Sequence, residues 1–563
     1  MRRRAAVWAA VVGGAFGDAF PRDGASCTLR VDAAAALHAA AESISALASS
    51  GHVGNVTVCI SGTHLLTAPL LLTAAHSLPD GAWVRWVGAD ARSNGGDDAA
   101  RLSGGFAVDD AVWVASAEGY SIAIDSKPRQ LWLAGARIPR SVLSAEKLAM
   151  VLPYTQDAEW HYTSDDAASL QHAEFVWRGT ITAWTEPRCP VVSVSQGRLR
   201  LEETCWFTLW NRNGHKHPGR PTAVEGSVEN VAWSVADASE AAFFADGSTA
   251  NFHGGAKCEA CSKCERCTHC ETCRPRSAVF GSLQTLLALD GASRHMFKNL
   301  AFEHSTWWRP EGLVGRQALV HWPDAYSLNA AKGNGLYALE VGNASQRISV
   351  VRCRFDDLSG GAVYLGGVDD ERAISKDEED WDSNLVVAEC RTNSTGLEFA
   401  GAPAIFAGYV ALTSLENNLI ENTAYSGISL GWGWGIAKCR VRSFARLNAV
   451  RGNVVRRPLR SLGDGGCYYT LGPQSGTTII DNICEGSGGQ GIGAFYLDTG
   501  SEGIEVSRNV VSETAKICLV AKGRGNAVDH LWCRGTANEL WRDKTVGPSA
   551  VNAPTIFRLR ATE

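Results

Sequence analysis

Eight phrases in the C-terminal half share a central Asn or Cys between short apolar runs: KNLAF (298–302), VRCRF (351–355), AECRT (388–392), ENNLI (416–420), RGNVV (451–455), IDNIC (480–484), SRNVV (507–511) and LWCRG (531–535). The central residues are Asn299, Cys353, Cys390, Asn418, Asn453, Asn482, Asn509 and Cys533. The steps between them, from the longest at Asn299 to Cys353 to the shortest at Asn509 to Cys533, are each long enough for one turn of a solenoid.

This spacing predicts that the central residues lie above one another in stacked coils. Parallel strands of successive coils are roughly 4.8 Å apart, so residues in register form a row. A buried Asn in such a row can hydrogen-bond the coils above and below, and Cys is a small apolar residue that fits the same space. The sequence therefore predicts an all-β fold, a right-handed parallel β-helix of the pectin-lyase type.

The composition agrees with a large exported globular protein. With 563 residues, 45% of them hydrophobic, the chain can bury an extensive core. The 58 Gly residues suit tight solenoid corners, and the 19 Trp residues suit either sugar stacking or core packing. A net charge of -6 argues against a nucleic-acid partner.

The first residues, 1–17, have a basic start, an apolar run and a small-residue ending. This pattern is typical of a secretory signal peptide; the alternative, a membrane anchor, would need a longer apolar run. No later segment reaches a membrane-spanning length. Sequons at Asn55, Asn343 and Asn393 are candidate glycosylation sites and are compatible with export. We expect a secreted protein.

The chain divides into several predicted parts. An Ala-rich helix over 32–50 is expected to cap one end of the solenoid, within an N-terminal part at 18–118 that includes the first coils. The repeat disappears over 119–250, where strand-like runs between loops predict an inserted β subdomain. The main β-helix is expected at 277–545, followed by a tail at 546–563.

Cysteines mark two further features. Cys189 and Cys205 flank strand-like runs of the insertion and form either a disulfide or two buried thiols. A segment at 251–276 contains six Cys at a spacing of three: Cys258, Cys261, Cys264, Cys267, Cys270 and Cys273. Overlapping C-x-x-C units suit a thiolate metal site, whereas export favours local disulfides, and the regular spacing also suits a low-complexity insertion.

Two carboxylates occur in the Gly-bounded phrases that end the coil strands. Asp464 lies in GDGGCYYTLGP (463–473) and Asp498 in GAFYLDTGS (493–501). Moving back from Asp498 by the local period, which is the step from Asn482 to Asn509, gives Leu471. Asp498 should therefore lie one coil above the end of the preceding phrase, and both carboxylates are expected to face one groove.

A carboxylate pair is what glycoside hydrolysis requires. One group must stay protonated to assist the leaving oxygen, while the other is ionised as a nucleophile or as a base for water. Such a reaction needs no cofactor. The alternative is that Asp464 and Asp498 are ordinary turn residues, since Asp next to Gly is common at corners.

Aromatic residues accompany the pair. The candidates for sugar stacking are Trp432, Trp434, Tyr468, Tyr469 and Tyr496, and the alternative for each is packing. A second cluster, Trp307 and Trp308 with His304, is interpreted as structural. His215 and His217 have a spacing that could hold a metal, but they fit a polar loop better.

Three stretches resemble a known family: LENNLIENTAYSGISLGWGWG (415–435), SLGDGGCYYTLGPQSGTTIIDNIC (461–484) and FYLDTGSEGIEVSRNVV (495–511). They are similar to the right-handed β-helix proteins of glycoside hydrolase family 141, which include α-L-fucosidase and xylanase activities on complex plant and algal polysaccharides. The resemblance is strong over about 405–510 and weaker elsewhere. It implies a polysaccharide substrate and acidic catalytic residues at Asp464 and Asp498. Two departures, Cys467 after the DGG phrase and the Cys-rich segment, leave an altered substrate or a lost activity open.

Two other functions remain open on the same fold. A polysaccharide lyase or uronate epimerase would need a base and a group that neutralises the uronate, and the acidic stretch 369–382 reads as one loop rather than as stacked calcium ligands. A non-catalytic carbohydrate-binding protein would need only the long face of the solenoid. The sequence does not indicate an oligomeric state.

Overall fold

The computed structural model describes most of the solenoid and parts of the insertion. The described residues are 26–89, 100–116, 119–124, 128–144, 159–161, 170, 172–177, 186, 188–195, 197–203, 226–229, 241–246, 249–254, 275–307, 337–432, 442–486, 492–512, 517–534 and 541–542. Predicted features at residues 1–17, 258–273 and 546–563 lie outside them.

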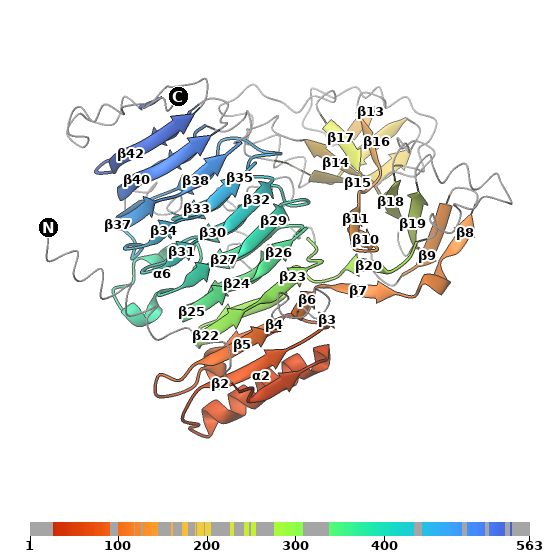
Figure 1. The fold of residues 1–563 in the computed structure, drawn as a ribbon. Helices are drawn as coiled ribbons and strands as arrows, with labels where there is room; N and C mark the ends of the chain where they lie inside the picture. The colour runs from red at the N-terminus through yellow and green to blue at the C-terminus, as the bar shows by residue number, and fades with distance from the viewer. Residues whose placement is uncertain are drawn as a thin grey trace, which may run out of the picture.

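Each coil of the C-terminal half contributes short strands to two parallel sheets. The coil that contains the DGG phrase places β36 (Tyr468–Thr470) in a ten-stranded sheet, and β37 (Pro473–Ile480) and β38 (Ile483–Glu485) in a nineteen-stranded sheet. Every one of these strands pairs in parallel with its counterpart in the next coil. Figure 1 shows the strands stacked in order along the molecule. The predicted parallel β-helix is confirmed.

The strands of the two sheets are short, as expected for coils with frequent corners. The ten-stranded sheet contains, in spatial order, β4 (Leu70–Thr73), β21 (Leu287–Asp290), β24 (Tyr337–Gly342), β27 (Gly361–Leu365), β30 (Ile405–Ala407), β33 (Ile428–Leu430), β36, β39 (Phe495–Leu497), β41 (Leu519–Ala521) and β43 (Trp541–Arg542). The nineteen-stranded sheet contains β1 (Leu29–Val31), β2 (Val56–Ile60), β3 (Thr63–Leu65), β5 (Val84–Gly88), β6 (Ala100–Ser103), β22 (Ser293–Lys298), β23 (Leu300–Glu303), β25 (Gln346–Val351), β26 (Arg354–Asp356), β28 (Val386–Ala388), β29 (Arg391–Thr395), β31 (Ser414–Glu416), β32 (Leu419–Thr423), β34 (Ala449–Arg451), β35 (Val454–Arg456), β37, β38, β40 (Glu502–Ser512) and β42 (Ala527–Arg534).

The N-terminal end of the solenoid is covered by a helix, α2 (Ala34–Ser49), as predicted. Its Leu37 and Ile44 side chains are fully buried in the same core as the solenoid interior. Figure 1 places α2 beside β2 at one end of the stack. The helix therefore shields the apolar interior that the first coil would otherwise expose.

A single residue with positive φ turns the chain between the two strands that each coil gives to the nineteen-stranded sheet. These residues are Asn299, Arg352, Glu389, Asn417, Gly452, Asp481, Arg508 and His530, with φ between 47° and 66°. The residue that follows each of them points into the interior. The buried row is therefore Leu300, Cys353, Cys390, Asn418, Asn453, Asn482, Asn509 and Leu531.

The four Asn side chains of this row form a continuous hydrogen-bonded ladder. Asn482 Nδ2 donates to the Val450 carbonyl at 2.9 Å and to Asn509 Oδ1 at 3.1 Å, and Asn482 Oδ1 accepts from the Asn453 backbone N–H at 2.9 Å. Asn453 and Asn418 repeat the pattern one and two coils earlier. Each amide thus satisfies buried backbone groups that the corner leaves without a strand partner.

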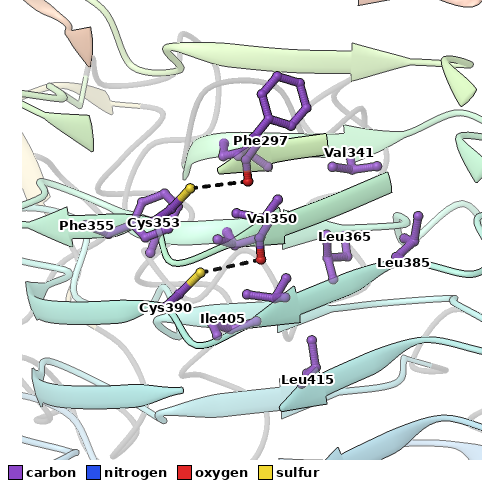
Figure 2. Close-up of a cluster of buried hydrophobic side chains, with 14 of the residues drawn as sticks. Phe297, Val341, Val350, Cys353, Phe355, Leu365, Leu385, Cys390, Ile405 and Leu415 are labelled. Carbon is purple, nitrogen blue, oxygen red and sulfur yellow. Dashed lines mark hydrogen bonds between the residues drawn. The ribbon is translucent and has the colours of Figure 1, made fainter. Parts of the chain in front are cut away.

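Cysteine takes the same place in the two earlier coils. Cys353 Sγ donates to the Phe297 carbonyl at 3.6 Å and Cys390 Sγ to the Val350 carbonyl at 3.5 Å (Figure 2). Both thiols are free and buried. The prediction that Cys substitutes for Asn in the row is confirmed at these two positions.

The prediction is wrong at both ends of the row. Asn299 occupies the positive-φ corner one residue early, because Ala301 pairs with Arg354 and so places Leu300 opposite Cys353. Cys533 pairs with Val511, whereas Asn509 pairs with Leu531. The buried row therefore ends at each side in a leucine, whose side chain has no hydrogen-bonding group to leave unsatisfied.

Replacing Asn482 by Ala should destabilise the fold markedly. The change leaves the buried Asn453 N–H without its acceptor and the Val450 carbonyl without its donor, so we expect the free energy of unfolding to fall by about 3 kcal/mol. Urea denaturation followed by circular dichroism measures the change. Ser414→Ala, in a half-buried position of β31, is the control and should change the stability by less than about 0.5 kcal/mol. Equal effects of the two substitutions would contradict the role of the ladder.

Antiparallel sheets interrupt the solenoid, as predicted. The first contains β7 (Gly105–Val108), β10 (Leu131–Leu133), β11 (Ala136–Ile138) and β20 (Ala278–Gly281). The second contains β12 (Val142–Ser144), β13 (Glu159–His161), β14 (Glu174–Trp177), β15 (Arg188–Ser195), β16 (Arg198–Leu201) and β17 (Gly226–Glu229). The third contains β8 (Val114–Ser116), β9 (Gly119–Ala123), β18 (Ala241–Asp246) and β19 (Thr249–Gly254). The sheets thus include β7, β8 and β20, which lie outside the predicted range 119–250. Figure 1 shows these sheets beside the coils.

Charged groups of the insertion contact the solenoid. The Arg129 guanidinium lies 4.9 Å from the centre of the Trp307 ring and pairs with Glu174. Arg137 Nε lies 3.0 Å from Asp357 Oδ1 on the solenoid. The Arg129–Trp307 contact and the Arg137–Asp357 pair therefore join the insertion to the coils.

Candidate functional site

Polar and aromatic side chains gather on the outer face of the ten-stranded sheet near its C-terminal end. Tyr469 of β36 pairs in register with Tyr496 of β39, and Tyr496 pairs with Val520 of β41. The two tyrosine rings pack edge to face with centroids 5.2 Å apart. Successive coils thus place the two phenol groups next to each other on one face.

Asp464 lies in the turn that leads into β36. Its φ of 53° is in the left-handed region, and its backbone carbonyl accepts a hydrogen bond from the Tyr425 hydroxyl at 2.9 Å. The turn needs glycine at the next position, because a Cβ on Gly465 would lie 2.5 Å from Ser426 Oγ and 2.9 Å from Leu459 Cδ2. The DGG phrase therefore reflects close packing against the preceding coil, which holds the partly exposed Asp464 in place.

Asp498 follows β39 directly. Thr470 pairs with Leu497, so Asp498 lies one coil beyond Leu471, in the register that the local period predicted. Its carboxylate accepts hydrogen bonds on both oxygens: Oδ2 from the Tyr469 hydroxyl at 2.7 Å, and Oδ1 from the Thr499 hydroxyl at 3.2 Å. Lys522 Nζ lies 2.9 Å from Oδ1. Asp498 is 5% exposed, and its carboxylate is thus held from several sides.

These contacts keep Asp498 ionised. Burial raises the pKa of this carboxyl, but the Lys522 ammonium and the hydrogen bonds from Lys522, Tyr469 and the Thr499 backbone outweigh burial and leave the pKa below its ordinary value. A charged partner and donors aimed at the carboxylate favour its ionised form.

For Asp464, the effects that raise the pKa of the carboxyl group outweigh those that lower it. Burial raises the pKa of the Asp464 carboxyl to about 6, and the negative charge of Asp498 contributes to the rise, while Lys522 and a hydrogen bond with Tyr496 oppose it. Below about pH 6 the site therefore holds one protonated and one ionised carboxyl group. This is the division of roles that a general acid and its partner require.

The Tyr496 phenol lies close to both carboxyl groups and to Lys522. Burial raises the pKa of Tyr496, and the charges of Asp498 and Asp464 and hydrogen bonds with both add to the rise. The same hydroxyl accepts from Lys522 Nζ at 2.5 Å. Asp464 and Asp498 belong to different coils, and the stacking of those coils brings them to one hydroxyl group.

The predicted sugar-stacking residues lie elsewhere than expected. Tyr468 points into the solenoid, stacks on Phe495 with centroids 4.7 Å apart, and donates to the Asn453 carbonyl at 2.9 Å, so its prediction as a sugar contact is wrong. Tyr469, Tyr496 and Trp432 are on the outer side but are only 3%, 0% and 2% exposed. They do not form an open platform: the two tyrosines contact the carboxylates, and Trp432 packs against Phe406. Trp434 lies outside the described residues.

Sequence reasoning missed Lys522 and Tyr425. Lys522 lies one coil beyond Asp498, in register through the Ala521–Leu497 pair, and the period of the preceding coil does not predict its position. Tyr425 supports Asp464 through its backbone, and no spacing in the sequence marks that contact.

Of the remaining aromatic and His candidates, the structure describes His304 and Trp307. His304 Nδ1 lies 2.9 Å from Ser103 Oγ, and its ring packs against Trp132, while Trp307 is buried against Phe399, as predicted for that cluster. Trp308, His215 and His217 lie outside the described residues. Among the sequons, Asn55 and Asn343 are exposed, whereas Asn393 is partly buried and accepts from Asn422 Nδ2 at 2.7 Å.

Disulfides lie near both carboxylate segments. Cys467, shortly after Asp464, is bonded to Cys484 across the interior, and Cys518, shortly before Lys522, is bonded to Cys533. A third bond joins Cys27 to Cys59. Cys189 is also disulfide-bonded, and Cys205 lies outside the described residues. Disulfides of this kind are typical of oxidising compartments.

Metal-binding clusters and membrane-spanning helices are both absent from the described residues. That part of the chain contains no group of three or more His, Cys, Asp or Glu placed to hold a metal ion, and the six-cysteine segment lies outside it. No helix among the described residues is long and apolar enough to cross a membrane.

Comparisons with known proteins identify the architecture. No protein family and no curated protein matches the sequence. A solved glycoside hydrolase matches the structure with a TM-score of 0.64 at 18% sequence identity, over 95% of this chain and 99% of that chain. At this identity the match shows a common fold over nearly the full length of both chains.

Weaker matches have TM-scores well below that value. PfbA, a surface adhesin of Streptococcus pneumoniae, matches with a TM-score of 0.28 and 13% identity, over 46% of this chain and 64% of that chain. The catalytic domain of a GH87 α-1,3-glucanase matches with a TM-score of 0.19 and 9% identity, over 74% and 82% of the two chains.

Proposed function

We propose that the protein is a secreted glycoside hydrolase that cleaves glycosidic bonds of a complex extracellular or cell-wall polysaccharide. Asp464 is the general acid and Asp498 is the nucleophile or the base that activates water. The observation that carries the proposal is the pair itself: one carboxyl group with a pKa of about 6 beside another that Lys522 and Tyr469 keep ionised. The full-length match to a solved glycoside hydrolase supports it.

The reaction follows from these protonation states. The Asp464 proton passes to the glycosidic oxygen as the C–O bond breaks, and the developing positive charge on the sugar lies near the Asp498 carboxylate. If Asp498 attacks the sugar carbon directly, water later hydrolyses a covalent intermediate and the configuration is retained. If Asp498 instead removes a proton from an attacking water, the configuration is inverted. Neither route requires a cofactor.

Membership of glycoside hydrolase family 141 is the finer part of this proposal. It rests on the DGG and YLD phrases, whose carboxyl groups the coils bring to one hydroxyl group. Substrates of the α-L-fucoside or β-xylan type are the first to test. Export is proposed from the signal-like residues 1–17 and from the disulfides among the described residues.

The test is a screen of the purified protein on plant and algal polysaccharides, with released sugars identified by mass spectrometry. Hydrolysis adds one water per cleaved bond, so the products should contain saturated sugars. Products with a carbon–carbon double bond, detected by ultraviolet absorption, would indicate a lyase instead. Binding without any product in every case would support a carbohydrate-binding protein and contradict the proposal.

A further inference from the structure

Lys522 occupies a defined place in the stack of coils. Ala521 at the end of β41 pairs with Leu497 at the end of β39, so Lys522 and Asp498 are the next residues in the same register. Lys522 Nζ lies 2.9 Å from Asp498 Oδ1 and 2.5 Å from the Tyr496 hydroxyl oxygen. It also lies 4.9 Å from the centre of the Tyr496 ring. Three consecutive coils thus supply Tyr469, Asp498 and Lys522 in sequence.

This arrangement leaves the Asp498 carboxylate little rotational freedom. Oδ1 contacts Lys522 and Thr499, while Oδ2 contacts Tyr469. A carboxylate has about four acceptor directions, so three donors on two oxygens define its plane. Because a reacting carboxylate must meet the sugar carbon or a water in a narrow range of angles, its orientation affects the rate directly.

We propose that Lys522 is a positioning residue, which holds the Asp498 carboxylate ionised and correctly oriented for the proposed hydrolysis. Its effect on the rate rests on the proposed function, whereas its effect on the charge of Asp498 does not. Lys522 itself keeps contact with protein groups on both sides and its side chain is 26% exposed, so it acts through Asp498 rather than on the bond that breaks.

The groups that face Asp498 come from several elements. Lys522 follows β41, Tyr469 is in β36, Tyr496 is in β39, Tyr425 lies between β32 and β33, and Asp464 precedes β36. Of these, Lys522 brings the positive charge and Asp464 a second carboxyl group. Without Lys522, two carboxyl groups would share a buried site with neutral phenols, and the ionised form of Asp498 would be disfavoured.

The decisive variant is Lys522→Met, which keeps the length of the side chain and removes its charge. We expect kcat to fall roughly 10- to 100-fold, as for the loss of one charge-assisted hydrogen bond, with a small change in KM. The acidic limb of the pH–activity profile should move to higher pH, because Asp498 then takes up a proton at higher pH. Lys522→Arg should restore much of the rate and return the limb towards its original position.

Arg524→Met is the matched control. Arg524 is exposed, lies two positions after Lys522, and carries the same charge without a contact to Asp498 in the described structure. Its loss should leave kcat and the acidic limb unchanged, because solvent and salt screen exposed charges. If Arg524→Met moves the limb as far as Lys522→Met does, the effect is one of general charge and the proposal fails.

A measurement independent of activity separates this inference from the proposed function. Carboxyl ¹³C NMR of protein labelled at aspartate, with the Asp498 signal assigned from Asp498→Asn, gives the titration midpoint of Asp498. The midpoint should be higher in Lys522→Met than in the wild type, and an unchanged midpoint overturns the role of Lys522. If the wild type hydrolyses no glycoside, the proposed function fails. The titration midpoint of Asp498 still tests whether Lys522 keeps this carboxylate ionised. Lys522→Gln provides the same comparison if the Met variant does not fold.

Discussion

Asp464→Asn should lower kcat on a polysaccharide by about 10²- to 10⁴-fold, the usual contribution of a general acid. The amide keeps the size of the side chain and the left-handed backbone, which Asn tolerates well, so the fold should persist. What is lost is the proton that Asp464 retains up to about pH 6 because burial and Asp498 raise its pKa. The deficit should therefore be one of chemistry rather than of substrate binding.

The leaving group provides a sharp check of this assignment. The nitrophenolate of a nitrophenyl glycoside departs without protonation, so kcat/KM of Asp464→Asn, which reports the first bond cleavage, should be close to the wild-type value on that substrate and low on the polysaccharide. Asp481→Asn, a change in a partly exposed carboxylate at a corner of the nineteen-stranded sheet, is the matched control and should leave both rates unchanged. An equal loss on both substrates would assign Asp464 another role.

Asp498→Asn should have the larger effect, about 10⁴-fold or more, on every substrate. Asn cannot supply the negative charge that faces the developing positive charge of the sugar, and it cannot attack carbon or deprotonate water. The loss of rate in Asp498→Asn should be the same for good and poor leaving groups, whereas the loss in Asp464→Asn should depend on the leaving group. Thermal unfolding monitors the fold, because the substitution also removes the charged partner of Lys522.

The configuration of the first product complements this variant. Proton NMR of the wild-type reaction shows whether the anomeric configuration is retained or inverted, and hence whether Asp498 acts as nucleophile or as base. A rate for Asp498→Asn within about tenfold of the wild type would exclude both roles.

The architecture was predictable because stacking places a small buried residue, Asn in four successive coils, at the same position of each coil. Asn418, Asn453, Asn482 and Asn509 all follow a corner residue and precede a β-branched or aliphatic run, and this local pattern survives variation in coil length. The ends of the row were not predictable from spacing alone. Leu300 and Leu531 have no polar group to mark the position, so the nearest Asn and Cys were chosen instead.

The site was predictable in part for the same reason. The local period placed Asp498 correctly against Leu471, since β36 and β39 pair without irregularity. The direction of Tyr468 and Tyr469 was not predictable, because two adjacent tyrosines alternate between interior and exterior and the sequence does not say which comes first. The difference in pKa between the two carboxyl groups depends on the donors that surround each of them. The sequence does not predict this difference, because Lys522 belongs to a coil whose length differs from that of the coil before.

The docking of the insertion lies beyond sequence reasoning. Arg129 contacts Trp307 and Arg137 contacts Asp357, although each pair joins distant parts of the chain. No periodicity relates an insertion to the coils it contacts, so contacts of this kind require coordinates. The same holds for Tyr425, whose hydroxyl reaches the backbone of Asp464 rather than a side chain.

One measurement bears most directly on the two protonation states: the pH dependence of kcat/KM for the wild type and Asp464→Asn on the same aryl glycoside series. For a poor leaving group, the wild-type rate should fall as the pH rises through about 6, where Asp464 loses its proton, and Asp464→Asn should lack this limb. If kcat/KM of Asp464→Asn still falls as the pH rises through about 6, as it does for the wild type, Asp464 is not the general acid.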